Sequence, residues 1–317
     1  MKYYCFLICI LPVTCLAQLK WQNVDSLFQP LPVDMHVYFT NDTLDGKPNI
    51  AYYVEAPLKS KRLHFTTDTT MNRRLTPQDF YAKNDSPLLV VNGTFFSFET
   101  NRNLNIVIKD GKTVSYNINS EKQKTGDTTK TIAVYKSAIG INKRGKADVA
   151  WIRSDSANNE TFASQFPVRT GAGNYFRIAP NGERISGPGP NFLAWNMQTA
   201  IGGGPALLQK GKVSISNNEE RMFAGKAIDD KHPRTAMGYT KDGKLIILVI
   251  QGRFPGKAEG ATLVQEATML QQIGCWEALN LDGGGSSCML VNGKETITPS
   301  DKEGERAVPA VFMIKAK

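Results

Sequence analysis

Residues 262–291 read TLVQEATMLQQIGCWEALNLDGGGSSCMLV, an order that predicts a helix, a strand and then a glycine-rich loop. Thr262 and Gln265 have the spacing of a capping box, in which two side chains satisfy free amides of the first helical turn. Gly274 supplies a common kind of helix end. The apolar positions that we expect on one side of this helix are Leu263, Val264, Ala267, Leu270 and Ile273.

Turn signals lie along most of the remaining chain. They are Asp110-Gly111, Arg144-Gly145, Asn181-Gly182, Lys210-Gly211, Asp242-Gly243 and Asn292-Gly293. Asn-Gly and Asp-Gly pairs favour hairpins, because both central residues must take positive φ. Residues 88–91 and 245–250 are continuous apolar runs, typical of strands buried on both faces, and the polar residues 118–131 and 154–160 are expected in surface loops. We therefore predict an α+β fold, with a mixed, hairpin-rich β-sheet system covered by a few helices.

The first residues have the pattern of a secretory signal. Lys2 precedes an apolar run over residues 5–16, and Ala17 follows it as a small residue at the expected cut. We expect residues 1–17 to be a signal peptide and the mature protein to be exported, to the periplasm or the extracellular space. A lipid anchor on Cys15 is the alternative. No stretch reaches the roughly 20 apolar residues of a membrane span.

The composition is that of an ordinary folded protein. Of the 317 residues, 41% are hydrophobic and 21% are charged, which allows a core and excludes a disordered or collagen-like chain. The net charge of +9 is compatible with an anionic partner. A nucleic-acid partner is not expected, because the basic residues are dispersed and no zinc-finger or base-stacking motif is present.

The loop at residues 282–287 is the sharpest chemical feature. Its three glycines let a ligand come close to the backbone and let several N–H groups converge on an anion, while Asp282 and Ser286 offer a carboxylate and a hydroxyl. A wide β-turn without a ligand explains the same residues. Three weaker candidates are Asn92-Gly93-Thr94-Phe95-Phe96, Gly202-Gly203-Gly204-Pro205 and His232-Pro233-Arg234-Thr235. Taken singly, these segments are explained by core aromatic residues, a tight bend and a solvated arginine.

Taken together and in this order, the segments resemble the motif series of the phosphodiester glycosidases. The matching stretches run from Asn92 to Phe96, Ile201 to Pro205, His232 to Gly238, Gln251 to Arg253 and Leu279 to Ser287. The resemblance covers residues 86–317, which we expect to form the catalytic domain after a β-rich region at 18–85, and residues 300–308 are also similar. It implies hydrolysis of a sugar 1-phosphodiester to free sugar and phosphomonoester, without a cofactor. The implied partner is a sugar phosphodiester or an exported glycan.

The resemblance also implies which residues act. Those expected in catalysis are Asp282, Arg234, Asn92 and His232. Those expected to bind the substrate are Gly203, Gly204, Arg253, Gly283, Gly284, Gly285 and Ser286. A phosphomonoester leaves as a stabilised anion, so positive charge on the phosphate matters more than a strong acid. Arg234 and the glycine amides are expected to bind that phosphate, and Asp282 to activate water or stabilise an oxocarbenium-like centre. Asn92 and Ser286 are expected to position sugar hydroxyls.

Two other functions are compatible with these residues. In one, Ser286 is a nucleophile served by His232, which the first hypothesis treats as a proton carrier, although the loop lacks the Gly-x-Ser-x-Gly elbow. In the other, the protein binds a glycan or a glycophosphate without turnover. That alternative is motivated by Gln251 and Gln265, where relatives commonly have Asp and Glu, and Thr94 is a further departure, at a position where relatives commonly have Gly.

No metal site is expected. The three histidines are far apart in sequence, and the acidic set that could hold a hard cation is Asp229, Asp230 and Asp282. Cys275 and Cys288 are the two cysteines left after cleavage, and both a disulfide and a pair of buried free thiols are open for them.

Overall fold

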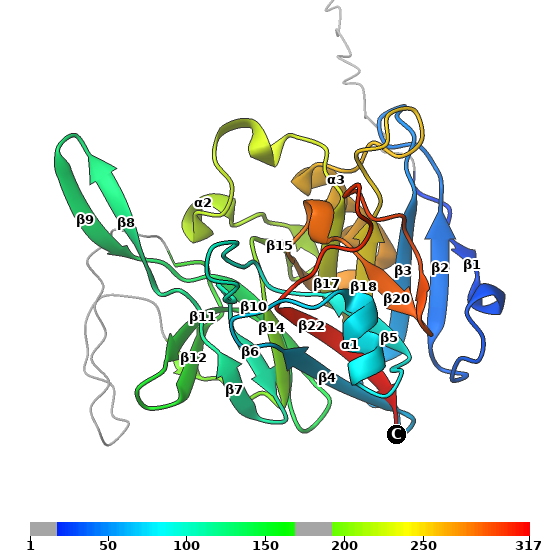
Figure 1. The fold of residues 1–317 in the computed structure, drawn as a ribbon, viewed down its shortest axis with the longest axis horizontal. Coiled ribbons are helices and arrows are strands. Elements are labelled where there is room, and N and C mark those ends of the chain that lie inside the picture. Colours follow the sequence, from blue (N-terminus) through cyan, green and yellow to red (C-terminus); the bar gives the residue numbers. More distant parts are fainter. Residues whose placement is uncertain (1–17, 169–191) are drawn as a thin grey trace, which may run out of the picture.

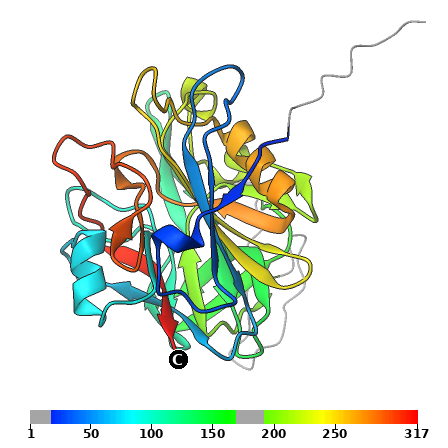
Figure 2. The same cartoon turned by 90° about the vertical axis from the view of Figure 1, so that its right-hand side faces the viewer.

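Residues 18–168 and 192–317 are described by the structure, a computed structural model. The expected signal segment, residues 1–17, and the turn signal Asn181-Gly182 lie outside these parts of the chain. Strands predominate, and they gather into three large sheets and one separate hairpin (Figures 1 and 2). The fold is therefore α+β in the broad sense, but mostly β.

The largest sheet has eight strands. In their order across the sheet they are β1 (Gln22–Asn23), β2 (His36–Thr40), β3 (Ala51–Pro57), β18 (Lys244–Ile250), β17 (Arg234–Thr240), β19 (Cys275–Asn280), β15 (Ala206–Gln209) and β16 (Lys212–Val213). The N-terminal region thus contributes three strands to the sheet that also carries β17 and β19. Because β3 pairs directly with β18, this region shares its hydrogen bonding with the rest of the fold.

Two smaller sheets and a hairpin complete the β structure. The seven-stranded sheet has the order β13 (Leu193–Ala194), β12 (Glu160–Ser164), β11 (Ala147–Asp155), β10 (Ser137–Ile141), β14 (Thr199–Gly202), β6 (Val107–Lys109) and β7 (Lys112–Ser115). The five-stranded sheet has the order β21 (Lys294–Glu295), β20 (Met289–Val291), β5 (Leu89–Asn92), β22 (Ala310–Ala316) and β4 (Leu63–Thr69). The separate hairpin is β8 (Ser120–Thr125) with β9 (Thr128–Ala133), which projects from the body in Figure 1.

Two expectations about the β structure were wrong. Residues 118–131 are not an irregular loop but most of the exposed β8–β9 hairpin, whose polar side chains give it no face to bury. The sheets are not mixed, because every strand pair in the described residues is antiparallel. Short hairpins join several of these neighbours, whereas parallel neighbours need long crossovers.

The predicted turns join consecutive strands as expected. Within the described residues they connect β6 to β7, β10 to β11, β15 to β16, β17 to β18, and β20 to β21. Asp110 and Gly111 have φ of 52° and 78°, and Asn292 and Gly293 have φ of 49° and 74°. Positive φ at both central residues is the conformation that the Asp-Gly and Asn-Gly pairs predicted.

The helices of the described residues are few. The α-helices are α1 (Pro77–Lys83), α2 (Asn217–Glu220) and α3 (Leu263–Ile273), and the 3-10 helices are η1 (Asp25–Leu27), η2 (Gly225–Ile228) and η3 (Gly284–Ser286). In α3 the capping box of Thr262 and Gln265 is formed, and Gly274 ends the helix with φ of 100°. The expectation for Val264 was wrong, because its side chain is 55% exposed. Glu266 lies on the packed side of the helix and is fully buried.

Strand β18 lies between two apolar layers, as its continuous apolar sequence predicted. One face contributes Leu245, Ile247 and Val249 to a cluster shared with β4, β5 and β22. The other face contributes Ile246, Leu248 and Ile250 to a cluster shared with α3. A strand covered on both faces is rigid, so the residues at its end are held in fixed positions.

Two further features bear on the expectations above. Cys275 and Cys288 are buried free thiols, so the structure contains no disulfide between them. In the described parts of the chain, none of the helices combines the length and the apolar character needed to cross a membrane.

Candidate active site

Several of the glycine-containing segments meet at one end of the largest sheet. Asp282 follows β19, and its N–H donates to the carbonyl of Gly93 at 3.0 Å, directly after β5. The N–H of Gly284 donates to the carbonyl of Pro233 at 2.8 Å, directly before β17. Segments that lie far apart in the sequence are thus joined by main-chain hydrogen bonds around residues 282–284.

Gly203 and Gly204 approach the same place from the end of β14. The N–H of Gly204 donates to the carbonyl of Asn280 at 2.7 Å. A Cβ atom on Gly203 would lie 2.4 Å from that carbonyl oxygen, which is closer than any side chain tolerates. Gly203 is therefore needed for close packing against β19, and Gly204 for close packing against Glu220, which is sufficient to explain both. Their expected contact with a substrate stays a prediction.

Asp282 is the titratable group at the centre of this arrangement. The residue as a whole is partly exposed, yet burial of its carboxyl group raises the pKa to about 7. The Ser286 hydroxyl, the charge of Arg306 and the N–H of Gly283 oppose that rise in pKa. A carboxyl group with a pKa near 7 exchanges its proton at neutral pH, as a general acid or base must.

Two arginines pack against the glycine loop. A Cβ atom on Gly284 would lie 2.9 Å from Nη2 of Arg253, and one on Gly285 would lie 2.2 Å from Nη2 of Arg306. The absence of side chains is what lets these guanidinium groups come so close to the loop. Arg253 is exposed, whereas Arg306 is half-buried and forms a bidentate ion pair with Asp301, at 2.8 and 3.0 Å.

Arg234 does not have the surroundings that its expected role requires. It is only 3% exposed, its Nε donates to the carbonyl of Ala261 at 2.9 Å, and its Nη2 donates to the carbonyl of Asp230 at 3.1 Å. Burial lowers the pKa of this guanidinium, and the nearby Glu266 opposes the change. Arg234 therefore braces the end of β17 from inside the fold, and its direct binding of a phosphate, as first expected, is not supported by this geometry.

The loop amides are also less available than expected. The N–H of Gly284 is used by Pro233, and the N–H of Gly283 interacts with the carboxylate of Asp282. The amide of Gly284 is therefore already used, and anion binding by the amides of Gly283 and Gly285 stays a prediction. The guanidinium groups beside the loop are the evident source of positive charge.

Asn92 is a structural residue of the site. It is fully buried, and its amide nitrogen donates to the main-chain carbonyl of Asp282 at 2.6 Å. Its amide oxygen accepts hydrogen bonds from the hydroxyl of Thr235 at 2.8 Å and from the N–H of Cys288 at 3.1 Å. The expected contact with sugar hydroxyls was wrong, because this side chain is enclosed by protein. It fixes where Asp282 lies.

His232 and Ser286 do not form a nucleophile–base pair in the structure. Within residues 18–168 and 192–317, no hydrogen bond joins them, and Nδ1 of His232 is buried without a partner. Burial and the positive charges of Arg234 and Arg253 lower the pKa of His232, which favours the neutral imidazole. The serine hydrolase hypothesis thus lacks its defining contact. The role of His232 as a proton carrier stays a prediction.

Glu266 is the acid that the sequence reasoning missed. It lies beside Gln265, whose side chain is occupied by the capping box and by a hydrogen bond to Asp45. Both carboxylate oxygens of Glu266 are buried without a hydrogen-bond partner among the described residues. Burial raises the pKa of Glu266 to about 8, and Arg234 opposes this rise. The sequence did contain an indication of this acid. Glu266 follows Leu263 by three positions and precedes Leu270 by four, so it lies on the side of the helix that packs against the core.

The other departures from the family pattern have structural partners. The hydroxyl of Thr94 donates to the side-chain oxygen of Asn103. The side-chain oxygen of Gln251 accepts from the N–H of Thr298 at 2.9 Å. Neither contact requires a ligand.

The acidic set considered for a cation is not assembled. Across the described residues, no group of three or more His, Cys, Asp or Glu side chains gathers as a metal site would require. Asp229, Asp230 and Asp282 therefore do not act together in this structure.

Comparison with known proteins identifies the family of this chain. The sequence model of the phosphodiester glycosidase family matches residues 86–315. The chain therefore belongs to the phosphodiester glycosidase family. Among solved structures, the catalytic domain of zebrafish N-acetylglucosamine-1-phosphodiester alpha-N-acetylglucosaminidase has a TM-score of 0.57 at 22% identity, over 95% of this chain and 89% of that one. A hypothetical protein from Synechocystis has a TM-score of 0.59 at 17% identity, over 94% and 68% of the two chains.

Sequence relatives match over shorter stretches. The prophage-derived protein YomE of Bacillus subtilis is 42% identical over 78 residues, which are 25% of this chain and 12% of that protein. Mouse N-acetylglucosamine-1-phosphodiester alpha-N-acetylglucosaminidase is 32% identical over 89 residues, which are 28% of this chain and 17% of the mouse protein. The aligned parts are thus less than a fifth of the relatives' own lengths.

Proposed function

We propose that this chain is an exported hydrolase that cleaves a sugar 1-phosphodiester to free sugar and a phosphomonoester. The observation that carries the proposal is the carboxyl group of Asp282, with a pKa of about 7, on a loop that packs against Arg253 and Arg306. Family membership supports the reaction class. The mouse and zebrafish relatives are named for N-acetylglucosamine 1-phosphodiesters, which makes such a diester the first substrate to test.

The positions of the charged side chains suggest a chemical role for each of them. Arg253 is exposed and has a planar guanidinium, which suits bidentate binding of a phosphodiester. Arg306 is paired with Asp301, whose carboxylate lies equally close to Gly285 and offsets its charge, so Arg253 supplies the net positive charge next to the loop. This charge stabilises the phosphomonoester anion as it leaves, so a strong acid on the leaving group is not required. Asp282, as the carboxylate, then activates water or stabilises positive charge at the anomeric carbon.

Turnover of a defined substrate tests the proposal. The mature chain is incubated with an N-acetylglucosamine 1-phosphodiester of a simple alcohol, and free sugar and alkyl phosphate are measured by mass spectrometry. We expect both products from the wild-type chain and a loss of at least about 100-fold in kcat/KM for Asp282→Asn and Arg253→Ala. The exposed Lys122→Ala, on the β8–β9 hairpin, is the matched control and should keep its rate. Tight binding without products would instead establish the glycan-binding alternative.

Isotope labelling identifies the bond that breaks. When the reaction runs in ¹⁸O water, attack at carbon places the label in the sugar, and attack at phosphorus places it in the phosphate. A carboxylate acting near the anomeric centre predicts label in the sugar. Label in the phosphate would mean that water attacks phosphorus, and Asp282 would then activate that water.

A further inference from the structure

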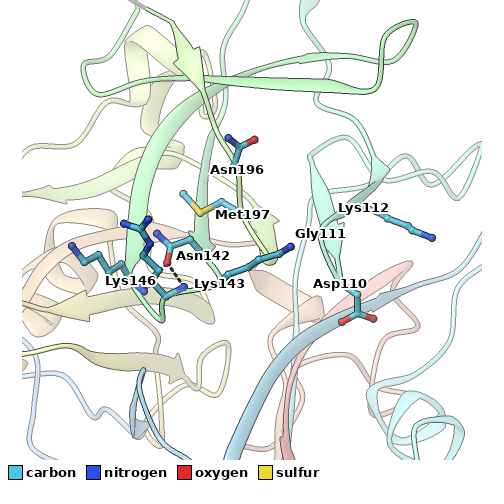
Figure 3. Close-up of a pocket in the computed structure, with 9 residues that line it drawn as sticks. Asp110, Gly111, Lys112, Asn142, Lys143, Lys146, Asn196 and Met197 are labelled. Carbon is cyan, nitrogen blue, oxygen red and sulfur yellow. Dashed lines mark hydrogen bonds between the residues drawn. The ribbon is translucent and has the colours of Figure 1, made fainter.

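A basic hollow lies between the β6–β7 turn, the β10–β11 turn and the residues before β14. Its volume is about 820 Å³. Figure 3 shows Lys143 extending from its turn toward the β6–β7 turn, with Asn196 and Met197 forming a neighbouring wall. Nothing in the proposed reaction uses these residues, so the hollow needs its own explanation.

The hollow lies at the end of the fold away from Asp282. Gly145, between the lining residues Arg144 and Lys146, packs against the carbonyl of Leu58, and the N–H of Leu58 donates to the carbonyl of Gly243 in the β17–β18 turn at 2.9 Å. The candidate active site is at the opposite end of the same hairpin, where Arg234 pairs with Ile250. A strand of seven residues separates these ends by about 20 Å. A ligand in the hollow is therefore not in the catalytic position.

The charges in the hollow are strongly one-sided. Four cationic side chains line it, namely Lys112, Lys143, Arg144 and Lys146, against the single carboxylate of Asp110. None of these four cations forms an ion pair within the described parts of the chain. Like charges that line one concave surface raise its positive potential, which attracts anions. The hollow is thus electrostatically suited to an anionic ligand.

The basic turn is held in a defined shape. The side-chain oxygen of Asn142 accepts hydrogen bonds from the N–H of Arg144 at 2.9 Å and from the N–H of Lys146 at 3.1 Å. This bonding fixes the backbone from which the cations extend and leaves the amide hydrogens of Asn142 for other partners. An amide beside fixed positive charge matches a ligand that carries hydroxyl groups as well as anionic groups.

A second cavity adjoins the hollow. That cavity, of about 200 Å³, shares Asn142 and Lys143 with the first and adds His64 and Lys317. It also reaches Thr199, whose buried hydroxyl has no hydrogen-bond partner among the described residues. A single small anion would fill neither cavity. A chain with repeated anionic and hydroxyl groups would occupy both.

We propose that the two cavities bind an anionic polysaccharide, whose repeated acidic groups pair with the lysine and arginine side chains. This inference does not depend on the proposed hydrolysis. Among the described residues, no aromatic ring lines the larger cavity, and the phenyl ring of Phe65, in the smaller one, belongs to a residue that is only 8% exposed. Stacking on aromatic rings is the usual means of holding single-stranded nucleic acid, so its absence favours a glycan over that kind of polyanion.

Calorimetric titration with polygalacturonate oligomers tests the proposal. The mature wild-type chain is compared with the double variant Lys143→Glu/Lys146→Glu. The control is Lys122→Glu/Lys124→Glu, which changes the net charge equally on the exposed β8–β9 hairpin. We expect the pocket variant to bind at least about tenfold more weakly and the control to bind like wild type. Binding should also weaken as salt rises, because the charges are exposed.

Four results would overturn the proposal. If the two variants lost the same affinity for the oligomers, the net charge of the protein alone would attract them. Equal binding of the methyl-esterified oligomers would show that the acidic groups are not recognised. Tighter binding of single-stranded DNA of similar length would assign the hollow to nucleic acid, and no measurable binding of the carboxylated oligomers would leave it without this ligand. Thermal melting of both double variants confirms that losses do not come from unfolding.

Discussion

The side-chain amide of Asn92 donates a 2.6 Å hydrogen bond to the main-chain carbonyl of Asp282, which lies 190 residues further along the chain. The same buried amide accepts hydrogen bonds from Thr235 and from the N–H of Cys288. Asn92→Ala leaves all three partners buried without this contact. We expect the free energy of unfolding to fall by about 3 kcal/mol or more, because each unsatisfied buried group costs roughly 1–3 kcal/mol.

Urea denaturation measures this change in the free energy of unfolding. Asn158→Ala is the matched control, because within the described residues Asn158 bonds to Asp155 alone, in an exposed turn. It should change stability by less than about 0.5 kcal/mol. If Asn92→Ala were as mild as this control, the amide would not be what holds the loop in place.

The pH dependence of hydrolysis should report the carboxyl group of Asp282. Burial raises its pKa from 3.8 to about 7, and the proposed mechanism uses the ionised form. The value of kcat/KM should therefore rise with pH and level off above about 7, since that limb reports the essential base of the free enzyme. Initial rates with the sugar phosphodiester between pH 5 and 9 measure this rise of kcat/KM with pH.

Two variants separate Asp282 from the other titrating groups. Asp282→Asn should abolish the rise of kcat/KM with pH together with most of the activity. Glu266→Gln should keep that rise, with its midpoint near pH 7. If the residual activity of Asp282→Asn kept the same pH dependence of kcat/KM, the titrating group would be a different one, and His232 would be the next candidate.

Local chemistry made much of the fold predictable. Asp110-Gly111 and Asn292-Gly293 specify hairpin turns through positive φ, which depends on two adjacent residues alone. The capping box of Thr262 and Gln265 likewise needs only its own helical turn. The antiparallel order of the sheets was not predicted, because strand pairing such as that of β3 with β18 is set by contacts far apart in sequence.

The candidate site was predictable in its members but not in their orientations. The motif series brought Asn92, Arg234 and Asp282 into one hypothesis, and hydrogen bonds do join their segments. Sequence spacing does not say which side chain faces solvent, so the burial of Asn92 and Arg234 was not predicted. Glu266 was missed for the same reason, because only packing reveals that it faces inward.

Glu266 should make stability fall as pH rises. Burial raises its pKa from 4.5 to about 8 in the folded protein. Between these values the unfolded chain has released the proton and the folded chain retains it, so raising the pH favours unfolding. Glu266→Gln removes this titration. Relative to wild type, we expect the variant to gain roughly 2–5 kcal/mol in the free energy of unfolding between pH 5 and pH 9.

Urea denaturation at these two pH values measures the gain. Glu99→Gln is the control, because Glu99 is exposed, and its difference from wild type should stay within about 0.5 kcal/mol at both pH values. A Glu266→Gln difference that does not change with pH would mean that Glu266 is ionised throughout, with Arg234 compensating its charge.

Glu220 holds the segment that leads from Gly204 into β15. Its Oε1 accepts hydrogen bonds from the N–H of Ala206 at 2.7 Å, the hydroxyl of Ser216 at 2.6 Å and the indole of Trp151 at 3.0 Å. Its Oε2 accepts from the N–H and the hydroxyl of Ser137, at 2.8 and 2.9 Å. The fully buried carboxylate thus serves five donors on four segments.

Glu220→Gln keeps the size of this side chain but replaces one acceptor oxygen with a donor. In either orientation the new amide nitrogen faces a main-chain N–H, of Ser137 or of Ala206, so at least one buried donor loses its acceptor. We expect the free energy of unfolding to fall by about 3 kcal/mol or more in urea denaturation. Glu219→Gln, at the adjacent position, should cost less than about 0.5 kcal/mol. A comparable loss in both variants would trace the effect to α2 itself, whereas a small loss in Glu220→Gln would show that Gly204 and β15 keep their positions without the carboxylate.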